Sequence, residues 1–359
     1  MRKILILGGT GAMGTHLVSL FENTDNEVWV TSRSKRTDKL NVKYFQGNAH
    51  DMNFLKKVLN QPVDIIVDFM IYTTLEFKNR VNFLLASCKQ YVYLSSARVY
   101  SNENEIITEE TPRLLDVCKD KVYLETDEYA LTKARQEDVL KINDKKNWTI
   151  IRPYVTYSET RLQLGVMEKE GWLYRALHGR SIVFSKDIAS KVTTLTYGFD
   201  VARGIAAIIG KTDALGEIFH ITAKSKSWKE ILAIYLSVIE NKTGSKPKVF
   251  YLDKNERLSY RKPNIGIWQV LVDRLYNRRF DNSKIAKFID IDTFLQVEEG
   301  LMKSLEYFIE HPNFKFINWR SEAYYDKLTH EHASLSEMET FKQKFKYIIY
   351  RYFVPIKFF

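Results

Sequence analysis

The feature that most constrains this chain is a glycine-rich turn that directly follows an apolar strand. The apolar run is KILIL at residues 3–7, and GGTGAMG follows at residues 8–14 before a helical apolar pattern begins. Glycine permits a tight turn and lets backbone amides approach an anion, which the N-terminus of the next helix also attracts. In this strand–turn–helix context the spacing predicts a dinucleotide-binding loop. The residues expected to form it are Gly8, Thr10, Gly11, Ala12, Met13 and Gly14.

Through residue 152 the chain alternates between short apolar strands and helical stretches. A segment such as DIIVDFMI (64–71) is apolar on both sides, as in strands covered by helices on both faces. We therefore predict an α/β fold, a doubly wound parallel sheet of the Rossmann type with ligands at the carboxyl ends of its strands. The expected strands are Lys3–Leu7, Glu27–Thr31, Val42–Phe45, Val63–Phe69, Tyr91–Leu94 and Thr149–Arg152.

Beyond residue 152 the regular alternation is lost, which predicts a smaller, mostly helical second lobe. We expect a dinucleotide-binding core over 1–152, a substrate-binding lobe over 153–310 and a basic, aromatic extension over 311–359. A late helix and strand from about 200–221 are expected to return to the core. The patterned segments of the second half are a helix at 200–209, a strand at 217–221, a helix at 228–240, a strand at 248–252 and mostly helical residues over 260–310.

Composition narrows the class of protein. The net charge of +10 predicts attraction to anionic partners without choosing among them. Two cysteines, Cys88 and Cys118, can form neither a disulfide framework nor a four-thiolate metal site. No apolar stretch approaches the roughly 20 residues that span a bilayer, and the first apolar run is too short for a secretory signal. We expect a cytoplasmic protein without a metal ion.

The end of the second expected strand bears on the choice of cofactor. An acidic residue there would bind the ribose hydroxyls of NAD. This chain has TSRSKR (31–36), in which Ser32 and Arg33 offer donors suited to a 2′-phosphate. NADP is therefore favoured, with NAD as the alternative.

Two further segments place chemically active side chains near the same edge of the sheet. LSSARVY (94–100) puts Ser95 and Ser96 at the carboxyl end of the fifth expected strand. YALTK (129–133) lies in a helical stretch, so Tyr129 and Lys133 are one turn apart on one face. A serine, a tyrosine and a lysine behind a dinucleotide loop predict proton transfer coupled to oxidation or reduction.

With these segments the chain resembles the extended short-chain dehydrogenase/reductase family, in its NAD(P)-dependent nucleotide-sugar epimerase/dehydratase branch, over roughly residues 1–310. The resemblance implies that Ser96, Tyr129 and Lys133 are catalytic, and that DNSK (281–284) is structural. Asn48 stands where an Asp is usual, and its amide would still contact the adenine. The further cofactor contacts implied are Asn48, Ala49, Phe69, Met70, Tyr129, Lys133, Pro153 and Val155.

The resemblance also implies which reactions to expect. A tyrosine has an ordinary pKa of about 10, and a lysine cation and the nicotinamide would lower it so that Tyr129 can exchange a proton with the substrate. Ser96 would hold the substrate oxygen. Ala97 and Arg98 stand where 4,6-dehydratases of the family carry an Asp–Glu pair, so dehydration is not expected. A nucleotide-sugar epimerase or a keto-sugar reductase, as used in polysaccharide biosynthesis, remains.

Substrate and partners are less constrained. Cations suited to a diphosphate occur in the second half of the chain. A rival hypothesis is a non-catalytic nucleotide- or RNA-binding protein on the same fold, because VDFMIYT (67–73) resembles the branch that contains chloroplast stem-loop RNA-binding proteins. Without an RNA-stacking motif, we expect a nucleotide-sugar substrate and no specific nucleic acid. The candidate cations are Arg161, Arg175, Arg180, Arg203, Arg278 and Arg279.

The last residues, FKQKFKYIIYRYFVPIKFF (341–359), are basic and aromatic and contain no acidic residue. A helix is expected from about Met338 to Phe353, because Pro355 disfavours a helical conformation at the residue before it. We expect its apolar stripe to pack on the protein's own body or on the second subunit of a homodimer, with contact to a membrane surface and disorder as alternatives. The stripe comprises Phe341, Phe345, Ile348, Ile349 and Tyr352.

Overall fold

The computed structural model describes residues 1–102, 105–253 and 266–356. The chain forms two compact units that alternate along the sequence. None of the described helices is both long and apolar enough to cross a bilayer. Unit 1 comprises residues 1–158, 194–225 and 278–297, and unit 2 comprises residues 159–193, 226–277 and 298–359.

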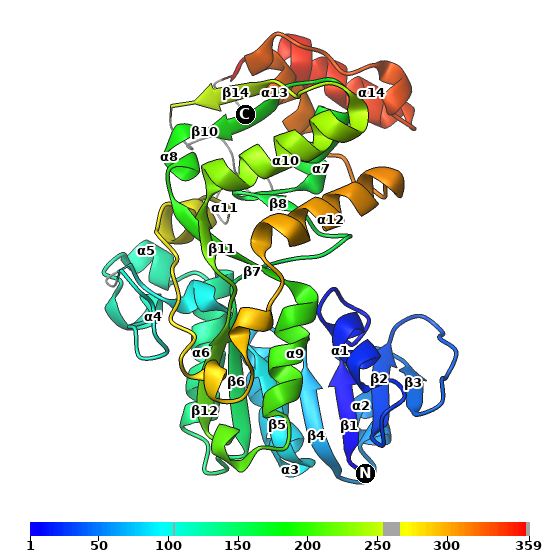
Figure 1. Cartoon of the computed structure of the whole chain (residues 1–359), viewed down its shortest axis with the longest axis vertical. Coiled ribbons are helices and arrows are strands. Elements are labelled where there is room, and N and C mark those ends of the chain that lie inside the picture. Colours follow the sequence, from blue (N-terminus) through cyan, green and yellow to red (C-terminus); the bar gives the residue numbers. More distant parts are fainter. Residues whose placement is uncertain (103–104, 254–265, 357–359) are drawn as a thin grey trace. The chain divides into compact units, whose positions relative to one another are not determined.

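Unit 1 is built on a seven-stranded parallel sheet in the order β12-β6-β5-β4-β1-β2-β3 (Figure 1). The strand order reverses beside β1, which is the doubly wound topology predicted from the sequence. The predicted fold is confirmed, including the late strand that returns to the sheet. The strands are β1 (Lys3–Leu7), β2 (Glu27–Ser32), β3 (Val42–Gln46), β4 (Val63–Asp68), β5 (Cys88–Leu94), β6 (Trp148–Pro153) and β12 (Glu217–Ile221).

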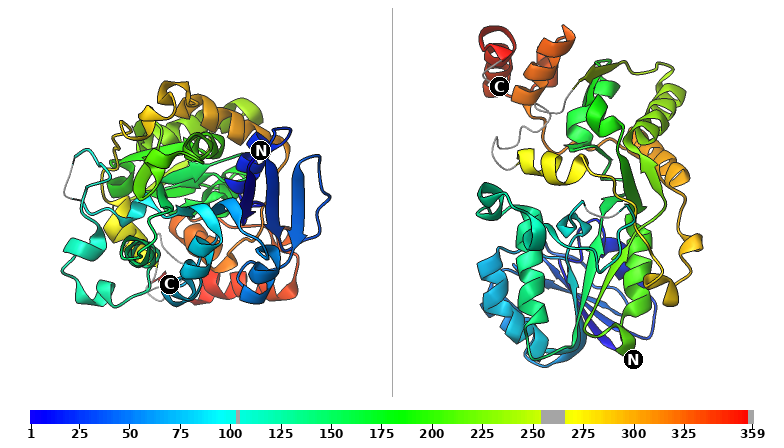
Figure 2. Two further views of the ribbon diagram at one scale, coloured as in Figure 1. Left: turned by 90° about the horizontal axis from the view of Figure 1, so that it is seen from below. Right: turned by 90° about the vertical axis from the view of Figure 1, so that its left-hand side faces the viewer.

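Helices cover both faces of this sheet (Figure 2). Leu17 and Ile205 pack with one face of the strands, and Leu55, Val81 and Leu140 pack with the other. The strands are apolar on both sides because both sides are buried. The helical segments of unit 1 are α1 (Gly14–Phe21), α2 (Met52–Val58), α3 (Thr74–Ala86), η1 (Ala97–Val99), α4 (Leu114–Val117), α5 (Lys121–Leu124), α6 (Tyr129–Lys141), α9 (Gly198–Ile208), η2 (Thr212–Ala214), η4 (Ile285–Lys287) and η5 (Ile291–Thr293).

Residues 278–297 return from unit 2 and are anchored in unit 1 by buried polar contacts. The guanidinium of Arg278 is buried and donates to the carbonyl oxygens of Tyr100 and Ser101, each at 3.0 Å. The Asn282 amide donates to the carbonyl of Thr222 at 2.8 Å and accepts from the Thr222 hydroxyl at 3.1 Å. Because Asn282 belongs to DNSK (281–284), these contacts are those of a structural element.

Unit 2 contains less β-sheet than unit 1 and is mostly helical. Its strands pair as β8 with β9 and as β10 with β14. Strands β11 (Val192–Tyr197) and β13 (Ser225–Ser227) carry the chain from one unit to the other, and β7 (Val155–Tyr157) pairs with β11. The expected helical residues 260–265 lie outside the described part of the chain. The remaining elements are β8 (Gln163–Leu164), β9 (Met167–Glu168), α7 (Lys169–Leu177), β10 (Ile182–Ser185), α8 (Lys186–Ala189), α10 (Trp228–Thr243), β14 (Val249–Leu252), α11 (Gly266–Gln269), η3 (Val270–Arg274), α12 (Val297–Glu310), α13 (Trp319–Thr329), η6 (Leu335–Glu337), α14 (Phe341–Ile348) and η7 (Ile349–Phe353).

A buried ion-pair array holds α13 against α7. Arg175 on α7 contacts Glu322 at 3.0 Å and Asp326 at 2.8 Å, and Arg180 contacts Glu322 at 3.4 Å. Burial raises the pKa of Glu322 to about 7, although both arginines oppose the shift. The sequence-based assignment of Arg175 and Arg180 to a substrate diphosphate is therefore wrong, because both guanidinium groups are committed to these carboxylates.

The same ion-pair array makes the C-terminal residues part of unit 2. The sequence suggested a separate extension over 311–359, whereas the structure includes residues 298–359 in unit 2. Glu331 reinforces this by accepting from the backbone amide and hydroxyl of Ser181, at 2.9 and 2.6 Å. If the segment that carries these carboxylates moved away from unit 2, the buried arginines would be left with unpaired charges.

The C-terminal helix packs through a different face from the predicted one. It begins at Phe341 rather than near Met338, because the Thr340 hydroxyl accepts from the amide of Gln343 at 3.2 Å and caps it. Its buried side chain is Tyr347, whereas Phe341, Phe345 and Tyr352 of the predicted stripe are exposed and Ile348 is partly packed. The expected packing of the whole stripe on the protein's own body is therefore wrong. Residues 357–359 lie outside the described chain.

We expect Arg175→Met to lower the free energy of unfolding by about 3–5 kcal/mol, because it removes the closer of the two cations that pair with buried Glu322 and Asp326. Urea-induced unfolding followed by tryptophan fluorescence measures this change. Lys303→Ala, which removes an exposed pair with Glu299 at 2.6 Å, is the control and should change stability by less than about 0.5 kcal/mol. Equal effects of the two substitutions would contradict the structural role of Arg175.

Candidate active site

The glycine loop joins β1 to α1 in a shape that larger residues cannot adopt. Gly8 has a φ of 70°, and its amide donates to the Thr31 hydroxyl at 3.2 Å. A Cβ on Gly14 would lie 2.7 Å from the Cα of Gly9 and 2.9 Å from the carbonyl oxygen of Gly8. The N-cap residue of α1 is Met13, whose side chain accepts no hydrogen bond from the helix amides. The loop thus fits a pyrophosphate, which its backbone amides would bind.

The remaining predicted loop residues lie at the surface of this turn. Gly11 and Ala12 are exposed, and Thr10 and Met13 are half-buried. Gly9 was missed by the sequence analysis, and a Cβ there would lie 2.7 Å from Val30. The position of Gly9 directly after Gly8 in the glycine motif could have identified it as part of the loop.

The ends of β2 and β3 supply the residues expected near the adenosine. Ser32 is buried, and its hydroxyl donates to the carbonyl of Ser34 at 2.8 Å, while Arg33 is exposed. After β3, Asn48 is exposed and accepts from the amide of His50 at 3.1 Å, and Ala49 is buried. The sequence analysis missed a residue that holds this loop: buried Arg80 on α3 donates to the carbonyl oxygens of Ala49 and His50, each at 3.1 Å.

The segment after β4 lies against the glycine loop. The amide of Phe69 donates to the carbonyl of Leu7 at 3.0 Å, and the sulfur of Met70 would lie 3.2 Å from a Cβ on Gly8. Pro153 ends β6 and Val155 begins β7, and both are buried. The structure therefore brings Phe69 and Met70 to the loop, and it places Pro153 at the carboxyl end of the neighbouring β5–β6 pair.

Ser96, Tyr129 and Lys133 surround the carboxyl end of β5. The ammonium group of Lys133 is buried and donates to the carbonyl of Leu94 at 2.7 Å and to the Tyr93 hydroxyl at 3.1 Å. It lies 5.9 Å from the ring centre of Tyr129, the first residue of α6. Ser96 is buried two residues after the strand ends. Burial lowers the pKa of Lys133 to about 8.

A second cation approaches Tyr129. The guanidinium of Arg98 lies 5.4 Å from the Tyr129 ring centre and pairs with Glu128 at 2.5 Å. Glu128 also caps α6 by accepting from the amide of Ala130 at 2.8 Å. The start of α6, and with it Tyr129, is therefore held by the segment that follows Ser96.

The family of the chain follows from its similarity to known proteins. The model of the NAD dependent epimerase/dehydratase family matches residues 4–222. The chain belongs to this family. A curated relative is the chloroplast stem-loop binding protein of 41 kDa b from Arabidopsis thaliana, 23% identical over 239 residues, which are 62% of this chain and 59% of that protein. The chain thus spans about three fifths of that relative's length. A second curated relative is a UDP-glucose 4-epimerase from Lactobacillus helveticus, which is 28% identical over 134 residues, and the match covers 40% of that protein.

Solved structures of epimerases share this fold. An epimerase from Methanothermobacter thermautotrophicus superposes with a TM-score of 0.67 and 17% identity, covering 86% of this chain and 93% of that one. The UDP-glucuronic acid 4-epimerase from Bacillus cereus, in complex with NAD, superposes with a TM-score of 0.62 and 18% identity, covering 87% and 100%. At these identities the likeness establishes the fold alone.

In this member of the epimerase/dehydratase family, a buried polar layer lies beneath the candidate lysine. Asp68 at the end of β4 accepts from the hydroxyls of Tyr91 at 2.7 Å and Tyr72 at 3.0 Å. Gln136 donates to the carbonyl of Tyr72 at 2.8 Å and accepts from the Tyr93 hydroxyl. Burial raises the pKa of Asp68 above its ordinary value. The sequence analysis missed this layer, although Gln136 lies one turn after the lysine on α6.

A buried ion pair fixes α6 against β6. Glu137 contacts Arg152 at 2.9 and 2.7 Å and Arg113 at 3.3 Å, and it accepts from the hydroxyl of Ser95 at 2.6 Å. Burial would raise the pKa of Glu137, but Arg152 and these other donors hold it below its ordinary value. Ser95 is therefore bound to α6, which leaves Ser96 as the candidate for substrate contact.

The other arginines expected near a diphosphate also contact protein groups. Arg203 pairs with Asp200 at 2.9 Å and donates to the Thr293 hydroxyl at 2.7 Å. Arg161 pairs with Glu168 at 3.3 Å, and Arg279 with Glu105 at 3.1 Å.

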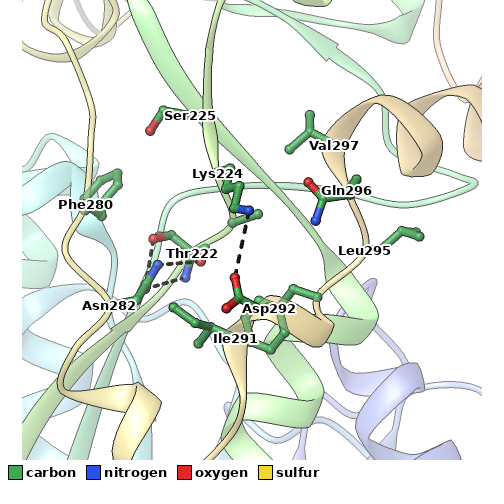
Figure 3. A pocket seen from close by; sticks show the side chains of 12 residues that line it. Thr222, Lys224, Ser225, Phe280, Asn282, Ile291, Asp292, Leu295, Gln296 and Val297 are labelled. Carbon is green, nitrogen blue, oxygen red and sulfur yellow. Dashed lines mark hydrogen bonds and ion pairs between the residues drawn. The ribbon is translucent and has the colours of Figure 1, made fainter.

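A pocket of about 320 Å³ lies elsewhere in unit 1, after β12 and beside residues 280–297 (Figure 3). Lys224 and Asp292 face each other across it at 3.8 Å, and Asn282 points toward Thr222. The predicted catalytic and cofactor-binding residues are not among those that line it, so the pocket does not form part of the candidate active site.

Proposed function

We propose that this protein catalyses the reversible, NADP-dependent oxidation and reduction of one carbon of a nucleotide-activated sugar, as an epimerase or as a keto-sugar reductase. The observation that carries the proposal is the position of Lys133. Its ammonium is buried against the end of β5, close to Tyr129 on the same helix and beside the strand that leads to Ser96. A buried cation beside a phenol is a costly arrangement that proton transfer uses and that packing does not need.

The chain's own residues then have distinct roles. Tyr129 exchanges a proton with the hydroxyl of the reacting carbon, and the cations of Lys133 and Arg98 near its ring stabilise the negative charge that develops on its oxygen. Ser96 donates a hydrogen bond to the substrate oxygen and orients it. When bound, the nicotinamide supplies the hydride acceptor or donor.

The same geometry supports redox chemistry at one carbon over 4,6-dehydration. The two residues after Ser96 are Ala97, which is fully buried, and Arg98, which is paired with Glu128. Neither can act as a carboxylic acid or carboxylate toward a substrate, and the 4,6-dehydratases that the family resemblance brings in use such a pair for elimination.

The relationship to a stem-loop binding protein supports a second candidate function, the binding of RNA by the same fold without catalysis. Turnover of a nucleotide sugar, seen as an epimerised product or as oxidation of NADPH by a keto sugar, would reject this candidate. Tight retention of a stem-loop RNA would favour it and reject the enzyme if UDP-, GDP- and dTDP-sugars gave neither a change in nicotinamide absorbance nor an epimerised product by NMR.

We expect Tyr129→Phe to reduce turnover by about 100- to 10,000-fold, because it removes the proton-exchanging oxygen and leaves the ring in place. Nicotinamide absorbance measures turnover of a reductase and NMR of the sugar product that of an epimerase, and fluorescence titration should show nearly unchanged NADP affinity. Tyr307→Phe, at an exposed tyrosine of α12, is the matched control and should leave turnover intact. A Tyr129→Phe protein with normal turnover would contradict the proposed role.

We expect Arg33→Asp to weaken NADP binding by about 10- to 100-fold and to leave NAD binding equal or improved, since a charge-assisted contact to the 2′-phosphate is worth roughly 1.5–3 kcal/mol. Parallel titrations with the two cofactors measure the preference. Arg36→Asp makes the same change in charge three residues later and should have a smaller effect. Wild-type protein that binds NAD much more tightly than NADP would exclude this reading of Arg33.

We expect activity in the oxidation direction to fall as the pH rises through about 8, where Lys133 loses its proton. Tyr93→Phe removes an oxygen that accepts a hydrogen bond from the ammonium, so the charged form is less stable and its pKa falls further. The alkaline limb of kcat/KM against pH should therefore move to lower pH by about one unit. An unmoved limb in Tyr93→Phe would show that Tyr93 does not act on Lys133.

A further inference from the structure

The C-terminal helix has one face that is firmly docked. The Tyr347 hydroxyl donates to a carboxylate oxygen of Asp326 at 2.6 Å and accepts from the amide of Ala333 at 2.7 Å. One turn later, the Arg351 guanidinium donates to the carbonyl of Glu331 at 3.0 and 2.9 Å. Helices α13 and α14 lie side by side in unit 2 (Figures 1 and 2). These contacts fix the rotation of α14 about its own axis.

That rotation leaves an aromatic stripe in solvent. Phe341 is 82% exposed, Phe345 is 56% exposed and Tyr352 is 60% exposed. The spacing of four residues puts Phe341 and Phe345 on one face of α14, and Tyr352 follows in η7, where its ring centre lies 5.1 Å from the guanidinium of Arg351. The rings of Phe341 and Phe345 lie nearly parallel, with centroids 6.3 Å apart. Grouped exposed aromatic rings at fixed spacing are a feature of binding surfaces, unlike scattered single ones.

Lysines flank the stripe on both sides. At about 100° per residue, Lys342 and Lys346 lie on one side of it and Lys344 on the other. Residues 340–359 contain no aspartate or glutamate. We call the three aromatic residues and these three lysines the aromatic–cationic face.

The charge of this face selects its partner. In a two-fold dimer the same patch meets itself, so docking of a second copy here would bring six lysines together. Single-stranded nucleic acid is bound in basic grooves lined by aromatic rings, whereas these rings project from one convex helix. An anionic bilayer offers both a planar negative surface, worth about 1 kcal/mol per nearby cation, and an interface that aromatic rings enter.

We propose that the aromatic–cationic face docks unit 2 on the surface of an anionic lipid bilayer. The helix lies in the plane of the membrane, with Phe341, Phe345 and Tyr352 among the headgroups and the lysines against the lipid phosphates. Docking does not require the helix to leave α13, because Tyr347 and Arg351, which hold the helix on unit 2, are not the residues that enter the membrane. The proposal does not depend on the proposed reaction.

The test is co-sedimentation of the full chain with vesicles of phosphatidylcholine alone and of phosphatidylcholine containing phosphatidylglycerol. We expect binding to the anionic vesicles only, weakened at physiological salt. Phe341→Ser/Phe345→Ser should reduce the bound fraction by about tenfold or more. Phe316→Ser, at another exposed phenylalanine of unit 2, is the matched control and should bind like wild type.

Charge reversal tests the electrostatic part separately. Lys342→Glu/Lys346→Glu should abolish binding, whereas Lys78→Glu/Lys229→Glu, at two other exposed lysines, makes the same change in net charge and should retain most of it. All altered residues are exposed, so thermal unfolding should match wild type and show that loss of binding is not loss of folding.

Several results would overturn the proposal. Full-length protein that stays in the supernatant with anionic vesicles at low salt would do so, as would equal loss of binding in both charge-reversed variants. Sedimentation velocity that shows a dimer, lost in Phe341→Ser/Phe345→Ser, would assign the face to a second copy. Retention on poly(U) that is lost in the same variant, with no vesicle binding, would assign it to nucleic acid.

Discussion

One buried ammonium group, that of Lys133, dictates how the carboxyl edge of the sheet in unit 1 is arranged. A desolvated cation is tolerated only where oxygen atoms surround it. The carbonyl of Leu94 and the hydroxyl of Tyr93 meet this need, so α6 must lie against the end of β5. Gln136 and the tyrosines above Asp68 extend the hydrogen bonding to β4. The place of Tyr129 follows, because it is one turn from the lysine on the same helix.

Arg98 illustrates how a residue acquires a role from its surroundings. In the sequence analysis, Arg98 mattered only because it stands after Ser96 where a carboxylate would be needed for 4,6-dehydration. In the fold its guanidinium lies over the ring of Tyr129 and pairs with Glu128, the residue that caps α6. The segment after β5 therefore positions Tyr129, the group proposed to exchange a proton with the substrate.

Unit 2 obeys the same constraint with different residues. Arg175 and Arg180 are buried and pair with Glu322 and Asp326 on α13, which holds this helix in place. The carboxylate of Asp326 then binds the Tyr347 hydroxyl and sets the rotation of α14. The exposed aromatic–cationic face at the end of the chain is thus a consequence of buried charges within the same unit.

The sequence by itself determined the elements whose signals are local. Strands such as Lys3–Leu7 and the glycine turn after them follow from side-chain pattern and from backbone freedom within a few residues. The one-turn spacing of Tyr129 and Lys133 is likewise a local property of a helix. Tertiary structure decided which carboxylates pair with Arg175, because its partners lie about 150 residues later in the chain. It also decided which face of α14 is buried, because a helical period predicts an apolar stripe but not the surface against which that stripe packs. The buried face of α14 is the one that carries Tyr347, because its hydroxyl group forms hydrogen bonds with Asp326 and Ala333. No periodicity in the sequence predicts these hydrogen bonds.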